Sequence, residues 1–140
     1  MKSGSKLLFV MLMAAALAAA MNFPRMARTA DDVQQISPDD LKKMIQSKKT
    51  DFLVVDVQPK VVYDISHIKG AINFPWTDEV KSPGALPRDK MLIFYCDCAR
   101  EEDSTGMAAQ MKQKFGYQNI RVLKGGWTGW QKLGYPVDKK

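Results

Sequence analysis

Thiol and imidazole groups are scarce in this chain of 140 residues. It has two cysteines, Cys96 and Cys98, and one histidine, His67. A zinc site built from these three would lack an obvious fourth ligand apart from a nearby acid, and it would lack the usual paired C-x2-C spacing. We therefore expect no metal site, and the sequence contains no cofactor-binding motif.

Clustered positive charge is also missing, although the chain is basic overall. There are 21 lysines and arginines against 15 acids, but the lysines occur as scattered pairs such as Lys42-Lys43, Lys48-Lys49 and Lys139-Lys140. A nucleic-acid interface requires basic residues gathered on one face or element. We expect these pairs to lie on solvated surfaces, and we expect no nucleic-acid partner.

The longest apolar run lies at the N-terminus. Residues 1–20 carry Lys2 and Lys6, then an uncharged segment that ends in small residues. This pattern predicts a secretory signal peptide cleaved after Ala20, and the alternative is an uncleaved membrane anchor. We expect an exported, periplasmic or extracytoplasmic protein that contacts a membrane only if this segment is retained.

The remaining chain is short enough for one domain. Residues 21–35 show no sustained hydrophobic period and predict a flexible lead-in, and residues 36–140 predict a single domain. Apolar runs and turn residues predict strands at 51–57, 70–75, 90–96 and 119–126, and helices at 37–49, 60–66, 104–116 and 125–134. Ser37 is a candidate N-cap with Pro38 at the first helical position, Ser104 or Thr105 would cap the third helix, and Gly116 would end it. Strands that alternate with helices predict an α/β fold, with a parallel sheet of four to five strands and helices on both faces.

Both cysteines fall where a ligand site is expected in such a fold. The loop from Cys96 to Ser104 follows a buried strand and leads into a helix. Ligands of open parallel sheets bind at the carboxyl ends of the strands, and the free N–H groups of a helix N-terminus can hold an anion. A cysteine there would be stabilised as a thiolate, which is the reactive form.

Four motifs in order then resemble the rhodanese-like family across residues 36–137. They are Asp56 at the end of a buried strand, the run from His67 to Asn73 (HIKGAIN), Cys96 at the end of a central strand, and Gly125-Gly126-Trp127 with Trp130. The resemblance implies a rhodanese-like fold and a sulfurtransferase. Such an enzyme moves sulfane sulfur from thiosulfate, a polysulfide or a persulfide to a thiophilic acceptor through a cysteine persulfide.

The resemblance also implies the roles of the site residues. Cys96 would be the nucleophile, and the substrate-binding loop would comprise Asp97, Ala99, Arg100, Glu101, Glu102, Asp103 and Ser104. Arg100 and the loop amides would bind the incoming sulfur oxyanion. The partners would be a small sulfur donor and a thiol acceptor, with no protein partner indicated. His67 would be structural, and Trp127 and Trp130 would pack in the core.

The loop departs from the family pattern, in which six positions separate the cysteine from the first serine of the next helix. Ser104 lies eight positions after Cys96 and six after Cys98. Cys98 is therefore an alternative nucleophile or a resolving thiol. We favour Cys96 because the run LIFYC matches the family's junction of strand and cysteine. Gln58 also replaces an arginine that is frequent in the family, so the local hydrogen bonds should differ.

The loop is unusually acidic. Asp97, Glu101, Glu102 and Asp103 flank the two thiols, and only Arg100 opposes them. Carboxylates close to a thiol raise its pKa and repel a dianion such as thiosulfate, so activity on thiosulfate should be poor unless they point outward. Phosphatases with the related Cys-x5-Arg loop need an arginine six positions after the cysteine, where this chain has Glu102 or Ser104. Phosphoryl transfer is therefore not expected.

The spacing of the two cysteines leaves two other functions open. A disulfide across one intervening residue removes little unfolded-state entropy, so it is a poor structural bridge and should be easily reduced. Cys96 and Cys98 could instead make the protein a thiol–disulfide redox carrier. The acidic loop is also compatible with a non-catalytic binding module on the same fold.

Overall fold

The computed structural model describes residues 33–98 and 100–139 of the chain. The predicted signal peptide, most of the predicted lead-in and Ala99 lie outside these residues. No helix in the described ranges is both long enough and apolar enough to cross a membrane.

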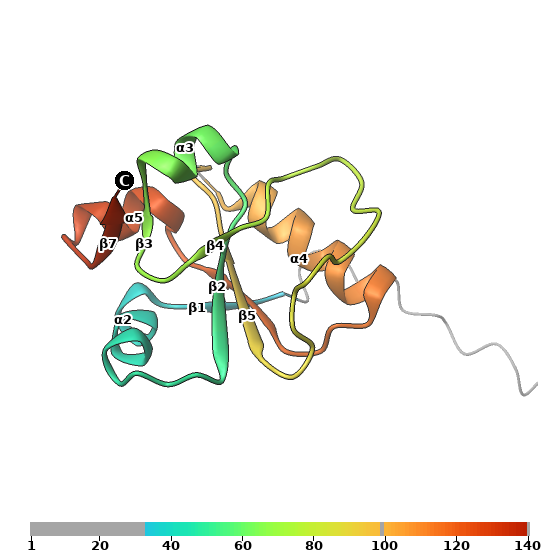
Figure 1. The fold of residues 1–140 in the computed structure, drawn as a ribbon, viewed down its shortest axis with the longest axis horizontal. Helices are drawn as coiled ribbons and strands as arrows, with labels where there is room; N and C mark the ends of the chain where they lie inside the picture. Colours follow the sequence, from blue (N-terminus) through green and yellow to red (C-terminus); the bar gives the residue numbers. More distant parts are fainter. Residues whose placement is uncertain (1–32, 99, 140) are drawn as a thin grey trace, which may run out of the picture.

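The centre of the molecule is a five-stranded sheet in which every neighbouring pair of strands is parallel. Its order is β1-β6-β5-β2-β4, which places β5 in the middle (Figure 1). The strands are β1 (Gln34–Ile36), β2 (Phe52–Asp56), β4 (Ile72–Asn73), β5 (Met91–Tyr95) and β6 (Ile120–Leu123). The predicted parallel α/β sheet is confirmed.

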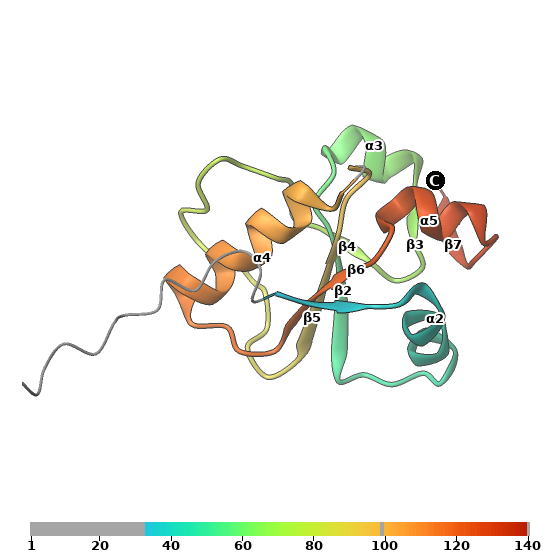
Figure 2. The same ribbon diagram turned by 180° about the vertical axis from the view of Figure 1, so that it is seen from behind.

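Helices cover both faces of this sheet, as predicted. The α4 helix packs on one face, while α2 and α5 pack on the other (Figure 2). The short α3 helix follows β2 beside the carboxyl ends of the strands. The helices are α2 (Pro38–Gln46), α3 (Lys60–Ile65), α4 (Glu102–Phe115) and α5 (Gly126–Lys132).

The two faces form separate apolar cores because successive side chains of a strand point to opposite sides. In β5, Phe94 joins the core under α4, together with Met107 and Met111. Its neighbour Tyr95 joins the core under α2 and α5, which also contains Trp130. Both strands of the β2–β5 pair are buried in this way, which explains why their sequences are continuously apolar rather than alternating.

The start of α2 follows the prediction from its sequence. Ser37 is the N-cap, and its hydroxyl accepts a hydrogen bond from the Asp40 N–H at 3.1 Å. Pro38 occupies the first helical position, where its missing N–H is not needed. Leu41 is fully buried, and Met44 and Ile45 pack beside it on the same face.

Three short strands were not predicted. β1 (Gln34–Ile36) pairs with β6, so regular structure begins inside the segment interpreted as a lead-in. β3 (Ser66–Ile68) and β7 (Val137–Lys139) form a separate antiparallel pair. Each has only three residues and includes polar or charged side chains, so none shows the apolar run of a buried strand.

The start of α4 differs from the prediction that Ser104 or Thr105 caps it. The N-cap is Glu101, which adopts a left-handed conformation with φ 56°, and the helix begins at Glu102. The Ser104 hydroxyl donates to the Glu101 carbonyl at 3.0 Å instead of accepting a hydrogen bond from a first-turn N–H. The predicted stop at Gly116 is confirmed, with φ 71° at the C-cap.

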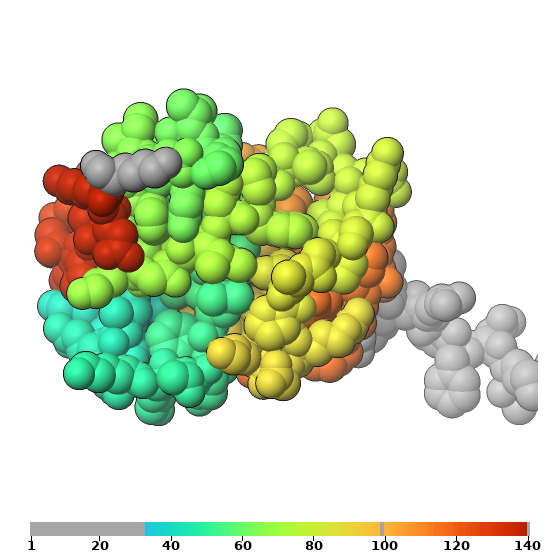
Figure 3. Space-filling view, in the orientation of Figure 1, coloured from blue at the N-terminus to red at the C-terminus, as the bar shows by residue number. Residues whose placement is uncertain are grey.

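The carboxyl ends of β2, β4 and β5 meet at one end of the sheet. On the molecular surface, α3 and the first part of the segment at residues 74–90 form neighbouring projections at this end, and the rest of that segment returns to the start of β5 (Figure 3). The candidate site lies between the chain segments that leave these strands.

Candidate functional site

A pocket of about 380 Å³ opens at the carboxyl end of the sheet. Three segments that follow the neighbouring strands β2, β4 and β5 line it, together with the first turn of α4. Its lining residues are Val57, Gln58, Pro59, Pro75, Trp76, Cys96, Asp97, Cys98 and Asp103. The position agrees with the rule that parallel sheets bind ligands at the carboxyl ends of their strands.

Cys96 lies at the base of this pocket, directly after β5. It is only 2% exposed and belongs to the core under α4. Its Sγ lies 3.4 Å from the hydroxyl of Ser104, which is also fully buried. Here the hydroxyl donates its proton to the Glu101 carbonyl, so it would have to rotate to donate to a thiolate at Cys96. The first turn of α4 thus holds a polar group against the sulfur.

Cys96 and Cys98 are joined in a disulfide, with their Cα atoms 5.4 Å apart. The spacing had marked this pair as a poor structural bridge, yet the loop brings both sulfurs together at the pocket. Cys98 is half-buried and lines the pocket beside Cys96. Neither cysteine is free in this state.

The start of α5 holds the backbone of Cys96 in place. The Trp127 N–H donates to the Cys96 carbonyl at 2.9 Å. Gly126, with φ +49°, approaches so closely that a Cβ atom there would lie 2.3 Å from the same carbonyl oxygen. Gly126 of the GGW motif therefore permits a close backbone contact that a larger residue would prevent.

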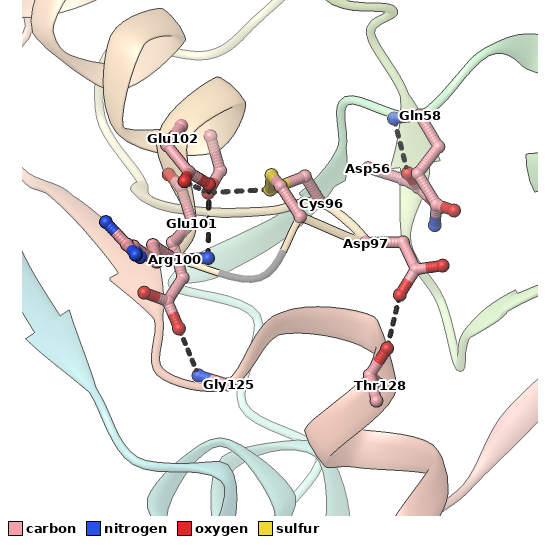
Figure 4. The surroundings of a disulfide bond; sticks show 11 residues. Asp56, Gln58, Cys96, Asp97, Arg100, Glu101, Glu102, Gly125 and Thr128 are labelled. Carbon is pink, nitrogen blue, oxygen red and sulfur yellow. Dashed lines mark hydrogen bonds between the residues drawn. A yellow bond between two sulfur atoms is a disulfide. The ribbon is translucent and has the colours of Figure 1, made fainter.

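Two of the four loop acids point toward α5 rather than lying free around the thiols (Figure 4). The Glu101 carboxylate accepts from the Gly125 N–H at 2.6 Å. The Asp97 carboxylate accepts from the Thr128 hydroxyl. These bonds fasten the loop to α5, so Glu101 and Asp97 have a structural role that their sequence positions did not reveal.

The other charged loop residues are arranged differently from the prediction. Arg100 is exposed, does not line the pocket, and its side chain extends away from Cys96 (Figure 4). Glu102 is exposed and accepts from the Arg100 backbone N–H at 3.1 Å. Asp103 lines the pocket together with Asp97. The described lining therefore contains two carboxylates and no cationic side chain.

Two of the loop amides that were expected to bind an anion already have partners. The Arg100 N–H donates to Glu102, and the Glu101 N–H donates to the Cys98 carbonyl at 3.4 Å. In the disulfide state these two amides stabilise the loop itself. Ala99, also predicted to be part of the binding loop, lies outside the described residues.

A buried hydrogen-bond network supports the floor of the site at the end of β2. The Asp56 carboxylate accepts from the Tyr95 hydroxyl at 2.5 Å, from the Gln58 N–H at 2.8 Å and from the Gln58 side-chain amide at 3.3 Å. The Tyr95 hydroxyl in turn accepts from the Ile68 N–H at 3.1 Å. Gln58, at the position where the family often has arginine, thus gives Asp56 two uncharged amide donors.

Burial raises the pKa of the Asp56 carboxyl, and the hydrogen bonds from Tyr95 and Gln58 only partly oppose this effect. Burial and the neighbouring Asp56 raise the pKa of Tyr95 well above its ordinary value. Tyr95 therefore remains a neutral donor to Asp56. Because Tyr95 precedes Cys96 directly, this network also fixes the strand end that carries the sulfur.

Sequence reasoning missed other residues that line the pocket, Trp76 and Gln58. Trp76 is 44% exposed and lines the pocket, and its backbone N–H donates to the Val57 carbonyl at 2.8 Å. Gln58 follows β2 and Trp76 follows β4, and these strands lie next to each other beside β5. Applying the rule about strand ends to every predicted strand would have indicated both residues.

The remaining predicted residues lie in the surrounding framework. His67 Nδ1 is 2.8 Å from the Tyr63 carbonyl, and its ring stacks on Tyr63 with centroids 3.8 Å apart. Trp127 and Trp130 are 6% and 0% exposed, which confirms their predicted place in the core. Within the described ranges, no three His, Cys, Asp or Glu side chains are grouped as a metal site would require.

Comparison with known proteins identifies relatives of this chain. The profile of the rhodanese-like domain matches residues 37–133. An adenylyltransferase and sulfurtransferase of Candida albicans is 34% identical over 106 residues, which cover 71% of this chain but only 24% of that protein. A thiosulfate:glutathione sulfurtransferase of Saccharomyces cerevisiae is 25% identical over 77% of this chain and 85% of its own length.

Solved structures show the same fold. The BH2092 protein of Bacillus halodurans superposes with a TM-score of 0.69 and 26% identity, covering 76% of this chain and 77% of that protein. A domain of an Anabaena protein superposes with a TM-score of 0.66 and 24% identity, covering 76% and 79%. The fold is thus placed among known structures.

Proposed function

Because the chain belongs to the rhodanese-like domain family, we propose that it is a sulfurtransferase that carries sulfane sulfur on Cys96. The thiolate of Cys96 attacks the outer sulfur of thiosulfate, a polysulfide or a persulfide. Thiosulfate loses sulfite, a polysulfide leaves one sulfur shorter, a persulfide leaves as a thiol, and in each case a Cys96 persulfide remains. A thiol acceptor then takes the outer sulfur and restores the Cys96 thiolate.

The observation that carries this proposal is the position of Cys96 at the base of the strand-end pocket. The inner sulfur is buried beside Ser104, and the pocket leaves space for one further sulfur and a small donor. The start of α4 also supports the choice of Cys96. Glu102, the first helical residue, lies six positions after Cys96, the position at which the family pattern has the first serine of this helix.

The alternative nucleophile, Cys98, fits less well. It is half-buried and lies within the loop rather than at the end of β5. The two residues that seemed to lengthen the loop belong instead to the first turn of α4. The extra length therefore gives no reason to move the nucleophile to Cys98.

Mass spectrometry of the reduced chain tests this function. We expect one added sulfur atom after incubation with thiosulfate or inorganic polysulfide, and we expect Cys96→Ser to gain none. Uptake by Cys96→Ser that is lost in Cys98→Ser would overturn the assignment of the nucleophile. If no variant gains sulfur while the wild-type chain cycles between dithiol and disulfide, the protein is a redox carrier, which the observed Cys96–Cys98 bond favours as the second candidate. If neither sulfur uptake nor disulfide cycling is observed, the remaining interpretation is a non-catalytic binding module.

The two carboxylates in the pocket should limit the use of thiosulfate. Asp103 lines the pocket, and its charge opposes the approach of a dianion. We expect Asp103→Asn to speed persulfide formation from thiosulfate about fivefold at low ionic strength, and by less at high salt because exposed charges are screened. The rate is measured as sulfite release. Asp51→Asn, a remote exposed acid, serves as the control. An equal gain in both variants would show that only net charge matters.

We further infer that residues 1–20 direct export of the domain to a periplasmic or other extracytoplasmic compartment. The support is the sequence pattern of two lysines, an apolar run and small residues. Analysis of the N-terminus of the protein recovered from its native host tests this inference. A mature N-terminus after Ala20 supports cleavage, whereas an intact segment in the membrane fraction supports an anchor.

A further inference from the structure

The two sulfur atoms of a Cys96 persulfide would differ in which thiols can reach them. The inner sulfur is Cys96 Sγ, which belongs to a residue that is 2% exposed and packed in the core under α4. The outer sulfur would project into the open pocket. An external thiol can therefore attack only the outer sulfur, and that attack transfers sulfur to the acceptor.

Attack on the inner sulfur has a different product. It forms a disulfide with Cys96 and expels the outer sulfur as hydrosulfide. In the persulfide the outer sulfur would occupy the pocket side of Cys96 Sγ, and the core covers its other sides. Attack on the inner sulfur therefore requires a thiol inside the site. The disulfide in the structure shows that Cys98 reaches Cys96 Sγ within the folded loop. One intervening residue also gives Cys98 a high effective concentration.

We infer that Cys98 resolves the Cys96 persulfide by releasing sulfide, which makes the protein a sulfide-producing persulfide reductase as well as a transferase. This inference rests on the proposed function, because it begins from the Cys96 persulfide. The Cys98 sulfur attacks Cys96 Sγ, a bond forms between the two cysteine sulfurs, and the bond from Cys96 Sγ to the outer sulfur breaks.

The step balances without an outside oxidant. The persulfide anion and the Cys98 thiol give the disulfide and hydrosulfide, and the thiol proton ends on the departing sulfur. The outer sulfur gains two electrons, and the two cysteines lose two. The next turnover requires a dithiol reductant, which opens the disulfide by exchange and leaves as a disulfide itself.

The negative charges of the pocket favour the release of hydrosulfide over the reverse reaction. Hydrosulfide is an anion, and Asp97 and Asp103 line the space into which it leaves. The same carboxylates oppose its return to attack the disulfide, which is the reverse reaction. Acids that hinder the binding of thiosulfate thus assist the release of the product.

Thiosulfate is the suitable probe because its transfer yields sulfite, so any sulfide must come from the outer sulfur of the persulfide. The reduced full chain is desalted without oxygen and incubated with excess thiosulfate and no reductant. Sulfite counts the sulfur atoms taken up, and sulfide counts those released. Intact mass reports the persulfide or the loss of two hydrogens.

We expect the wild-type chain to release about as much sulfide as sulfite and to end as the disulfide. Cys98→Ser and Cys98→Ala should form sulfite, retain the added sulfur and release at least about tenfold less sulfide per sulfite. Adding a dithiol should give repeated sulfide release only from the wild-type chain. Cys96→Ser should form neither product.

Two results would overturn the inference and separate it from the proposed function. If the wild-type chain retains its persulfide as long as Cys98→Ser does, or if both release equal sulfide, Cys98 does not resolve the persulfide. The proposed transferase function would still stand. Absence of sulfite from every variant removes the persulfide itself, and both proposals fail together. Matching thermal unfolding of the serine and alanine variants with the reduced wild type confirms that each is folded.

Discussion

Substitution of Gly126 by alanine should lower the free energy of unfolding by about 3 kcal/mol and slow sulfur uptake by Cys96. Two costs add at this position. The φ of +49° is unfavourable for a residue with a Cβ, and that Cβ would meet the Cys96 carbonyl oxygen at 2.3 Å. The backbone at Cys96 would have to shift, and the hydrogen bond from Trp127 N–H to the Cys96 carbonyl would weaken.

Alanine substitutions at the neighbouring glycines distinguish the cost of the positive φ from the cost of the close contact. Gly125 also has a positive φ, +76°, but a Cβ there would meet its nearest atom at an ordinary 3.6 Å, so Gly125→Ala should cost about 1 kcal/mol. Gly129 lies within α5 with its nearest contact at 3.9 Å, and Gly129→Ala should be neutral or stabilising by about 0.5 kcal/mol. Urea unfolding measures all three. Equal losses at Gly125 and Gly126 would contradict the close contact with Cys96.

Replacement of Tyr95 by phenylalanine should also cost about 3 kcal/mol at neutral pH. Its hydroxyl donates to Asp56 and accepts from the Ile68 N–H, so its loss leaves two buried groups without this partner. Tyr117→Phe is the matched control. The Tyr117 hydroxyl is also buried, but it donates only to the neutral Leu86 carbonyl, at 2.7 Å, and its loss should cost about 1 kcal/mol.

The effect of Tyr95→Phe should depend on pH. Burial raises the folded-state pKa of Asp56 above its ordinary value of 3.8, so the folded protein retains this proton to higher pH than the unfolded chain. The ionised carboxylate therefore costs stability increasingly as pH rises from about 3.8 through the raised pKa. The Tyr95 hydrogen bond reduces that cost, and its removal raises the pKa of Asp56 further.

The difference in unfolding free energy between wild type and Tyr95→Phe should accordingly be larger at about pH 8 than at about pH 5. The Tyr117→Phe difference should not change over this range, because Leu86 contributes only a backbone carbonyl. Denaturant titrations at several pH values measure both differences. A Tyr95→Phe loss that is constant with pH would show that the hydroxyl does not act on the Asp56 carboxylate.

The strongly apolar segments were predictable because their burial is determined by local sequence. Strands at 51–57 and 90–96 and the cap of α2 at Ser37 all appear where the residues predicted them. The three short strands depend on distant pairing instead. Residues 137–139 are extended because they pair with residues 66–68, and nothing in the local run VDK requires this.

The candidate site shows the same division. The position of Cys96 at a strand end could be read from the apolar run that precedes it, whereas the orientation of the acids could not. Glu101 and Asp97 bond to Gly125 and Thr128, which lie far along the chain. Their sequence positions suggested a repulsive ring around the thiols. Glu101 and Asp97 instead hold the loop against α5, and Asp97 also lines the pocket together with Asp103.

The pairing of distant segments has a consequence for how the domain folds. β1 pairs with β6, and β3 pairs with β7, so each of these ladders joins an early segment to a late one. Closing such large loops is entropically costly before the contacts form, which slows folding. During synthesis, β1 and β3 cannot pair until β6 and β7, near the end of the described chain, have emerged. The domain should therefore acquire its cooperative structure late, and a nascent chain arrested before residue 120 should remain sensitive to proteases.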